Sequence, residues 1–111
     1  MMRSEGVRPT PQTAAVLRVF LARPGDEHYG FELSKAADLP TGTVYPILSR
    51  LEDAGWLVSS WEQIDPSVEG RRPRRNYQIT DKGAVAARSL IATVDSRLAR
   101  WGVPKLGQAH S

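Results

Sequence analysis

The sequence has 111 residues, a length that suits one domain and leaves no room for a second. With 41% hydrophobic and 24% charged residues the composition is ordinary for a globular protein, and a net charge of +3 permits an anionic partner without requiring one. The absence of cysteine excludes disulfides, thiolate catalysis and zinc fingers. No apolar run is long enough to span a membrane and no signal pattern opens the chain, so we expect a soluble, cytoplasmic protein without a membrane partner.

A first helix is predicted between Thr10 and Arg23. Thr10 can serve as the N-cap, and Pro11 then takes the first helical position, where a proline has no hydrogen bond to lose. An apolar stripe at helical spacing follows, formed by Thr13, Val16, Leu17, Phe20 and Leu21. The run Arg23-Pro24-Gly25 is a strong stop. Residues 1–10, before this helix, are expected to be a flexible N-terminus.

A short second helix is predicted to open at Gly30, after a turn over residues 26–29. Its apolar residues are Phe31, Leu33 and Ala37, and residues 38–40 break it. Residues 39–55 then predict a third helix. Two helices joined by a short break have the outline of a helix-turn-helix.

The apolar residues of the third helix follow the i, i+3, i+4, i+7 rule, at Val44, Ile47, Leu48 and Leu51. Thr43 is the expected N-cap, which puts Pro46 at the third helical position, and Gly55 suits the left-handed residue that closes the helix. The remaining polar face comprises Thr41, Thr43, Tyr45, Ser49 and Arg50. Short hydroxyls, an aromatic ring and an arginine suit a helix that enters a DNA major groove, although a solvated helix face has the same pattern.

Two strands are predicted after the third helix, at residues 56–62 and 75–80, where aromatic and branched residues are frequent. In the second strand Tyr77 and Ile79 are expected to face inward. The connection over residues 63–74 is too long for a tight turn, so the strands form an extended hairpin. A helix-turn-helix followed by such a hairpin is the order of a winged helix, an α+β fold that is mainly α.

The hairpin carries four arginines around Pro73, namely Arg71, Arg72, Arg74 and Arg75. So many guanidinium groups on one loop repel each other unless an anion receives them. This pattern favours contact with DNA phosphates, with one arginine able to enter a minor groove. The alternative is a solvated basic loop that Asp65 and Glu69 neutralise.

A long final helix is predicted over residues 81–102, capped by Thr80 and Asp81 and followed by a flexible tail at residues 103–111. Its apolar residues recur at alternating spacings of 3 and 4, as in a coiled-coil seam, at Ala84, Ala87, Ile91, Val94, Leu98 and Trp101. The seam could simply close over the core of the predicted DNA-binding domain, residues 11–80. A helix of roughly 30 Å exceeds what that domain can cover, so we expect a homodimer whose two third helices lie about 34 Å apart on one face of DNA.

Trp101, at the end of the seam, could line a dimer cavity that stacks a planar ligand, or it could anchor the packing alone. His28 and His110 are not placed for a catalytic triad, and the chain has no glycine-rich phosphate loop and no metal-ligand motif. We therefore expect no enzymatic activity, no cofactor and no metal.

Several motifs resemble the PadR family of bacterial transcriptional regulators. They are Tyr29-Gly-Phe-Glu-Leu33, Leu39-Pro-Thr-Gly-Thr-Val-Tyr-Pro-Ile-Leu48, Arg50-Leu-Glu-Asp-Ala-Gly55, Gly70-Arg-Arg-Pro-Arg-Arg-Asn-Tyr77 and Thr80-Asp-Lys-Gly83. Their order and spacing agree with the family over residues 11–100, which is nearly the whole chain.

The resemblance implies a dimeric winged-helix repressor that binds a dyad-symmetric operator. The residues of this chain that match functional positions in the family's motifs are the wing arginines and Thr41, Thr43, Tyr45 and Pro46. Members of the family often release DNA on binding a phenolic or multidrug-like ligand near the dimer interface. A single C-terminal helix is typical of the shorter branch, so a ligand site would be built from that helix and the N-terminal one. Residues 64–69 make the wing longer than is usual.

These observations predict a homodimeric transcription regulator, most simply a repressor, whose partners are double-stranded DNA, a second copy of the chain and, where an inducer exists, a small aromatic molecule. In this interpretation the wing arginines and Arg50 supply salt-dependent affinity and the start of the third helix reads bases. The alternative is a dimeric winged-helix protein-interaction module that does not bind DNA and whose basic loop docks an acidic partner.

Overall fold

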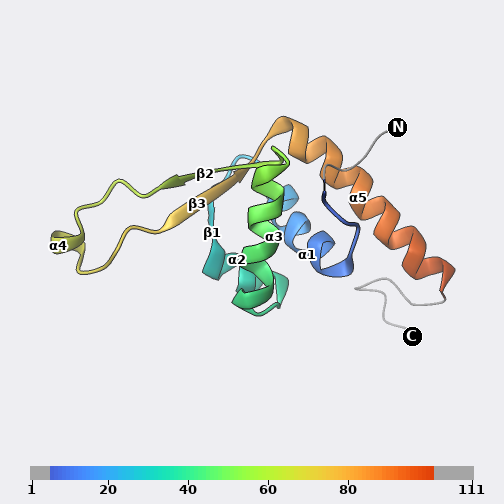
Figure 1. Cartoon of the computed structure of the whole chain (residues 1–111), viewed down its shortest axis with the longest axis horizontal. Coiled ribbons are helices and arrows are strands. Elements are labelled where there is room, and N and C mark those ends of the chain that lie inside the picture. Colours follow the sequence, from blue (N-terminus) through green and yellow to red (C-terminus); the bar gives the residue numbers. More distant parts are fainter. Residues whose placement is uncertain (1–5, 102–111) are drawn as a thin grey trace.

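A computed structural model describes residues 6–101 of the chain. Its elements, in order, are α1 (Pro11–Ala22), β1 (His28–Tyr29), α2 (Gly30–Ala37), α3 (Thr41–Asp53), β2 (Leu57–Trp61), α4 (Pro66–Glu69), β3 (Arg75–Ile79) and α5 (Asp81–Arg100). Figure 1 shows α1, α2 and α3 gathered at the centre, with the long hairpin of β2 and β3 projecting to one side and α5 running out on the other. The predicted winged-helix fold is confirmed.

The first helix begins and ends where the sequence predicts. The Thr10 hydroxyl accepts from the Thr13 backbone N–H at 3.1 Å, and Pro11 is the first helical residue. The apolar stripe is buried, with Val16, Leu17 and Phe20 completely inaccessible. Val7, which precedes the helix and falls in the segment expected to be flexible, is also buried in the core, at 4% exposure.

The second helix is oriented by the short strand in front of it. The Tyr29 backbone N–H donates to the Glu32 carboxylate at 2.9 Å, which satisfies one free donor at the helix start. Leu33 is buried, whereas Phe31, one of the apolar residues that marked this helix, is 62% exposed. The helix ends at Asp38, whose φ of 56° is left-handed.

The third helix starts three residues earlier than an N-cap at Thr43 predicts. Pro40 is the residue before the helix and Thr41 its first residue, so the predicted N-cap, Thr43, lies inside the first turn. Pro46 is therefore the sixth helical residue rather than the third, and it cannot donate the hydrogen bond that the Gly42 carbonyl would otherwise accept. The prediction that no bond is lost there was wrong.

The C-terminal end of α3 closes as predicted. Gly55 has a φ of +81°, and its N–H donates to the Glu52 carbonyl at 3.0 Å. The Trp56 N–H donates to the Leu51 carbonyl at 2.9 Å, which completes a Schellman motif. This closure turns the chain directly from α3 into β2.

The three strands form one antiparallel sheet in the order β1-β3-β2. Tyr77 of β3 lies opposite His28 on one side and Ser59 on the other. Tyr77 and Ile79 are both buried at 7% exposure, which confirms their inward orientation. The two-residue strand β1 was not predicted, because its residues fell in the expected turn over 26–29.

Helix α5 packs along α1 and covers the core. The Thr80 hydroxyl accepts from the Gly83 N–H at 2.9 Å and starts the helix. Gly83 is required there, because a Cβ at that position would lie 2.1 Å from the Trp56 carbonyl oxygen. Further along, Arg18 of α1 and Asp95 of α5 form an ion pair at 2.6 Å. Within residues 6–101, no helix is both long and apolar enough to cross a bilayer.

Candidate nucleic-acid interface

The exposed side of α3 carries the polar residues that the sequence singled out. Thr43 is half-buried, and the others are exposed, namely Thr41, Tyr45, Pro46, Ser49 and Arg50. The opposite side is anchored by four buried apolar residues, Val44, Ile47, Leu48 and Leu51. Because that apolar side fixes the rotation of the helix, its hydroxyls, aromatic ring and guanidinium group face solvent together. This is the arrangement that a helix needs to meet base edges in a groove.

Tyr45 is both a surface residue and a packing residue. Its side chain is 47% exposed, yet its ring lies so close to Gly30 that a Cβ there would be 2.5 Å from the ring. Gly30 is the first residue of α2, so the ring joins the two helices of the helix-turn-helix. Sequence reasoning assigned Tyr45 only a role in DNA binding and missed this packing role.

The two strands and their connection, residues 57–79, form the wing, which projects well beyond the helices (Figure 1). Its centre is Glu62, directly after β2. The Glu62 carboxylate accepts from Arg71 at 2.6 Å, from the Arg74 backbone N–H at 2.8 Å and from the Tyr29 hydroxyl at 2.9 Å. These donors hold the pKa of Glu62 down at about 2. Glu62 is therefore ionised at neutral pH and clamps both sides of the wing loop to β1.

The same contacts raise two other pKa values. The hydrogen bond to Glu62 raises the pKa of the Tyr29 phenol and that of the Arg71 guanidinium group. The Arg74 guanidinium group lies over the Tyr29 ring, 4.5 Å from its centroid. Arg74 is thus held between the ring of Tyr29 and the carboxylate of Glu62, whose nearest oxygen is 3.6 Å from Arg74 Nε.

Arg75 links the wing to the end of α3. Its Nε donates to the Ser59 hydroxyl at 2.9 Å, and its terminal nitrogen lies 3.4 Å from the Glu52 carboxylate. The Ser59 hydroxyl in turn donates to Glu52 at 2.5 Å. The Arg75 guanidinium group also lies 5.5 Å from the centroid of the Trp61 ring, which is 56% exposed. These contacts fix the angle between the wing and α3.

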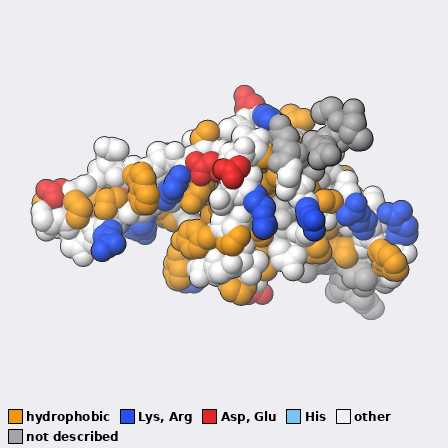
Figure 2. Space-filling view, in the orientation of Figure 1, with side chains coloured by type: hydrophobic (Ala, Val, Ile, Leu, Met, Phe, Trp, Pro, Cys, Tyr) orange, Lys and Arg blue, Asp and Glu red, His pale blue; other side chains and the backbone are white. Residues whose placement is uncertain are grey.

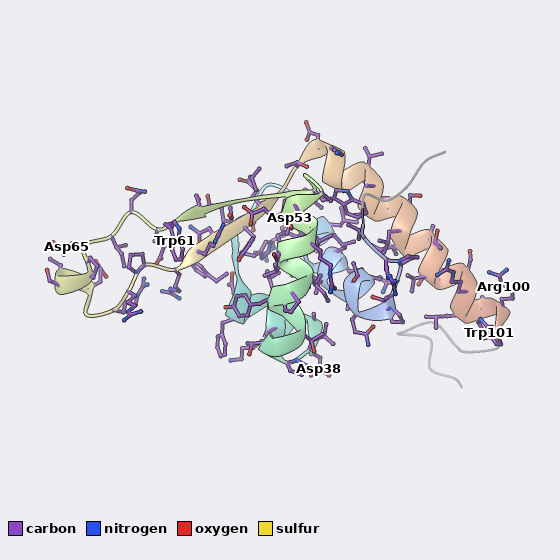
Figure 3. The ribbon with its side chains drawn as sticks, viewed as in Figure 1. Asp38, Asp53, Trp61, Asp65, Arg100 and Trp101 are labelled. Atoms are coloured by element: carbon purple, nitrogen blue, oxygen red, sulfur yellow. The ribbon has the colours of Figure 1, made fainter. Side chains whose placement is uncertain are left out.

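Arg72 is the wing arginine without an acidic partner among the residues that the structure describes. The alternative of a solvated loop named Asp65 and Glu69 as the neutralising residues, but Glu62 and Glu52 pair with the other three arginines. Asp65 instead accepts from the Ser67 N–H at 3.0 Å and from the Ser67 hydroxyl at 2.7 Å. Those bonds lower the pKa of Asp65 and cap α4 at the tip of the wing (Figure 3).

The apolar seam of α5 is divided between the core and the surface. Ala87 and Val94 are buried at 0% and 3% exposure, together with Leu90 at 5%. Three residues seven positions apart are partly buried, namely Ala84, Ile91 and Leu98, and Trp101 is 80% exposed. The six predicted residues therefore do not form one continuous exposed stripe, because α1 covers part of it. Figure 3 shows Trp101 at the end of the molecule opposite the wing tip.

In the described part of the chain, no three His, Asp or Glu side chains are grouped to hold a metal ion. His28 packs edge-on against Phe20, with ring centroids 5.1 Å apart, as a packing residue. Figure 2 shows that Lys and Arg side chains lie on the surface of the wing and also across the helical part of the molecule toward α5.

The model of the transcriptional regulator PadR-like family matches residues 21–89, which include α2, α3 and the entire wing. The chain belongs to this family. Its members are transcriptional regulators and not enzymes, in agreement with the expectation from the sequence. No curated protein matches the chain.

Solved structures support the fold. A transcriptional regulator homologue from Pyrococcus horikoshii OT3 is 20% identical, with a TM-score of 0.62 over 85% of this chain and 86% of that one. A possible transcriptional regulator from Methanosarcina mazei Go1 is 22% identical, with a TM-score of 0.58 over 83% of this chain and 75% of that one. MepR of S. aureus, in complex with DNA, is 17% identical, with a TM-score of 0.59 over 84% of this chain and 69% of that one.

Proposed function

We propose that this PadR-like regulator is a repressor that binds a dyad-symmetric DNA operator as a homodimer. The observation that carries the proposal is the exposed polar side of α3, formed by Thr41, Tyr45, Pro46, Ser49 and Arg50 with half-buried Thr43 beside them. The wing is fixed next to it by the contact of Arg75 with Glu52. A helix and a wing held at a set angle can contact adjacent grooves of one duplex. The DNA complex of MepR, a protein of similar fold, supports this assignment.

The wing supplies backbone affinity in this proposal. Arg72 is exposed and has no acidic partner in the described residues, so its charge is available to a phosphate. Arg71, Arg74 and Arg75 are already paired with Glu62 or Glu52. Their main role is to hold the loop in place, and they add a smaller share of the attraction to the phosphates. Among the four wing arginines, Arg72 is therefore expected to contribute most to phosphate binding.

The homodimer is proposed to form through α5. Ala84, Ile91 and Leu98 recur every seven residues and remain partly accessible, and the largely exposed indole of Trp101 follows Leu98 by three residues, at the end of the helix. A two-fold axis through paired α5 helices would repeat α3 on a second half-site. Ala87 and Val94 would support this surface from inside the protomer rather than contact the partner.

Trp101 is also proposed as the stacking surface for a planar aromatic effector. The exposed indole offers a large apolar face, and pairing of two α5 helices would bring a second copy near it. Binding there would change the relative position of the two half-sites, which is how an effector bound far from DNA can release it. Quenching of Trp fluorescence by the effector, abolished in Trp101→Phe, would identify this surface.

The wing can be tested without knowledge of the operator, because phosphate contacts are independent of sequence. Arg72→Ala is expected to weaken binding to a random duplex and to reduce the slope of log K against log salt by about 0.9 for each phosphate that the variant no longer neutralises. Arg72→Lys keeps the charge and is the matched control, with the wild-type slope expected. Equal slopes for Arg72→Ala and wild type would remove Arg72 from the interface.

A second candidate function is a winged-helix module that binds an acidic protein and not DNA. The observation in its favour is that the wing exposes the apolar side chains of Trp61, at 56%, and Val68, at 76%, which a protein partner can bury and a phosphate backbone cannot. Retention on a random-DNA column at moderate salt separates the two candidates. A protein that passes through the column without delay would favour the protein-interaction module.

A further inference from the structure

A groove of about 720 Å³ lies between α3 and the segment that leads into α1. One wall is formed by Gly6, Arg8, Thr10, Gln12 and Thr13, and the other by Gly42, Thr43, Pro46, Ile47 and Arg50. None of these residues is acidic. The sequence did not associate the first wall with DNA, since residues 1–10 were expected to be flexible and Gln12 and Thr13 to belong to the first helix.

Two arginines give the groove its charge. Arg8 and Arg50 stand on opposite walls, both are exposed, and neither side chain forms an ion pair within residues 6–101. Arg8 is held in place by its neighbours, because Val7 is buried in the core and the Arg8 carbonyl accepts from the Thr10 N–H at 2.9 Å. Two unpaired guanidinium groups facing one groove repel each other unless an anion lies between them.

Uncharged donors line the same groove. Gln12 lies in the first turn of α1 and Gly42 in the first turn of α3, where a backbone N–H has no carbonyl partner within its helix. The Gln12 amide and the Thr43 hydroxyl add side-chain donors. A tetrahedral phosphate oxygen accepts from such groups, and the first turns of helices favour negative charge.

We propose that this groove binds a phosphate of the DNA backbone, as a contact separate from the wing. The proposal rests on the proposed function, because the phosphate is taken to belong to the duplex that α3 reads. The groove favours that source over a free anion because Thr43, Pro46 and Arg50 belong both to its wall and to the candidate base-reading side of α3. A duplex in contact with α3 would bring its backbone against Arg8 and Gln12.

The test compares Arg8→Ala with Arg23→Ala, each in the full chain. Arg23 lies at the other end of α1, is 76% exposed at its side chain and only weakly paired with Asp26 at 3.6 Å, so it matches Arg8 in charge but not in position. Binding to a random 30-base-pair duplex is measured by fluorescence anisotropy at several salt concentrations. Arg8→Ala is expected to lower the slope of log K against log salt by about 0.9 per phosphate, and Arg23→Ala to leave it unchanged.

A second measurement identifies the source of the phosphate. Amide chemical shifts of Gln12 and Gly42 are followed by NMR, first with inorganic phosphate and then with the duplex. Larger shifts with the duplex, reduced in Arg8→Ala, support the proposal. Shifts with inorganic phosphate alone, with an unchanged salt slope in Arg8→Ala, would show a small-anion site and overturn it.

Failure of the groove and failure of the proposed function give different results. Wild-type protein that binds the duplex, with Arg8→Ala behaving identically, overturns the groove alone. Wild-type protein that binds no duplex at low salt overturns both. Circular dichroism of Arg8→Ala confirms the fold, which an exposed side chain outside the core is not expected to alter.

Discussion

At the scale of single residues, Glu62 decides how much charge the wing presents. Its side chain is 11% exposed, and its carboxylate receives hydrogen bonds from Arg71, the Arg74 backbone and Tyr29. Without it, Arg71 and Arg74 would be two more mobile cations on the loop. No local pattern marks Glu62 in the sequence, because its partners lie 9, 12 and 33 residues away. Asp65 and Glu69 are closer to the arginines in sequence, and the alternative of a neutralised loop therefore named them.

Glu62→Gln is expected to change how stability depends on acidity. The pKa of Glu62 falls from its ordinary 4.5 to about 2 in the folded protein, so its contribution is fully present above pH 4.5 and is lost as the pH falls toward 2. Thermal unfolding between pH 2 and pH 5 should show a shallower loss of Tm for Glu62→Gln than for wild type. Parallel curves for the two proteins would mean that the Glu62 network does not form in solution.

At the scale of elements, the helices with strong apolar periodicity were predicted well. α1 and the closure of α3 follow directly from Thr10-Pro11 and from Gly55, because caps act through the nearest residues. The start of α3 was misplaced because Thr43 is a better N-cap by type than Pro40, which caps without a side-chain hydrogen bond. The elements missed entirely, β1 and α4, have two and four residues, too few for periodicity to show.

Because the Tyr45 ring packs between α2 and α3, Tyr45→Phe separates a role in DNA binding from a role in packing better than Tyr45→Ala does. Phenylalanine keeps the ring over Gly30 and removes only the hydroxyl, so the fold is expected to be unchanged. If the hydroxyl reads a base, operator affinity should fall by about 0.5–1.5 kcal/mol, the contribution of one hydrogen bond, while binding to random duplex is unaffected. Equal affinity of Tyr45→Phe and wild type for the operator would assign Tyr45 to packing alone.

At the scale of the whole molecule, the wing and α5 extend from opposite ends of the helical centre (Figure 1). The sequence predicted both the wing and α5, but it did not show which seam residues of α5 are buried in the core and which lie at the surface. That division depends on how α1 packs against α5, with Ala87 and Val94 turned inward and Trp101 outward. The heptad spacing is the same for a helix that covers its own domain and for one that pairs with a second chain.

Trp101→Glu is expected to weaken dimerisation, because it places a charge on the most exposed apolar residue at the end of the seam. Sedimentation equilibrium should give about twice the 12.3 kDa chain mass for wild type and a lower average mass for the variant. Val85→Glu is the matched control, since Val85 is 69% exposed on α5 but is not one of the six seam residues. A wild-type mass of one chain would contradict the dimer.

The proposed function requires this PadR-like regulator to recognise a particular DNA sequence as a dimer. The most direct test is fluorescence anisotropy with the DNA upstream of the protein's own gene, at two salt concentrations, with a random duplex of equal length as control. We expect tighter binding to the upstream DNA, two chains per site and weaker binding to both duplexes at higher salt. Absence of binding to either duplex at the lower salt concentration would rule out DNA recognition by this protein.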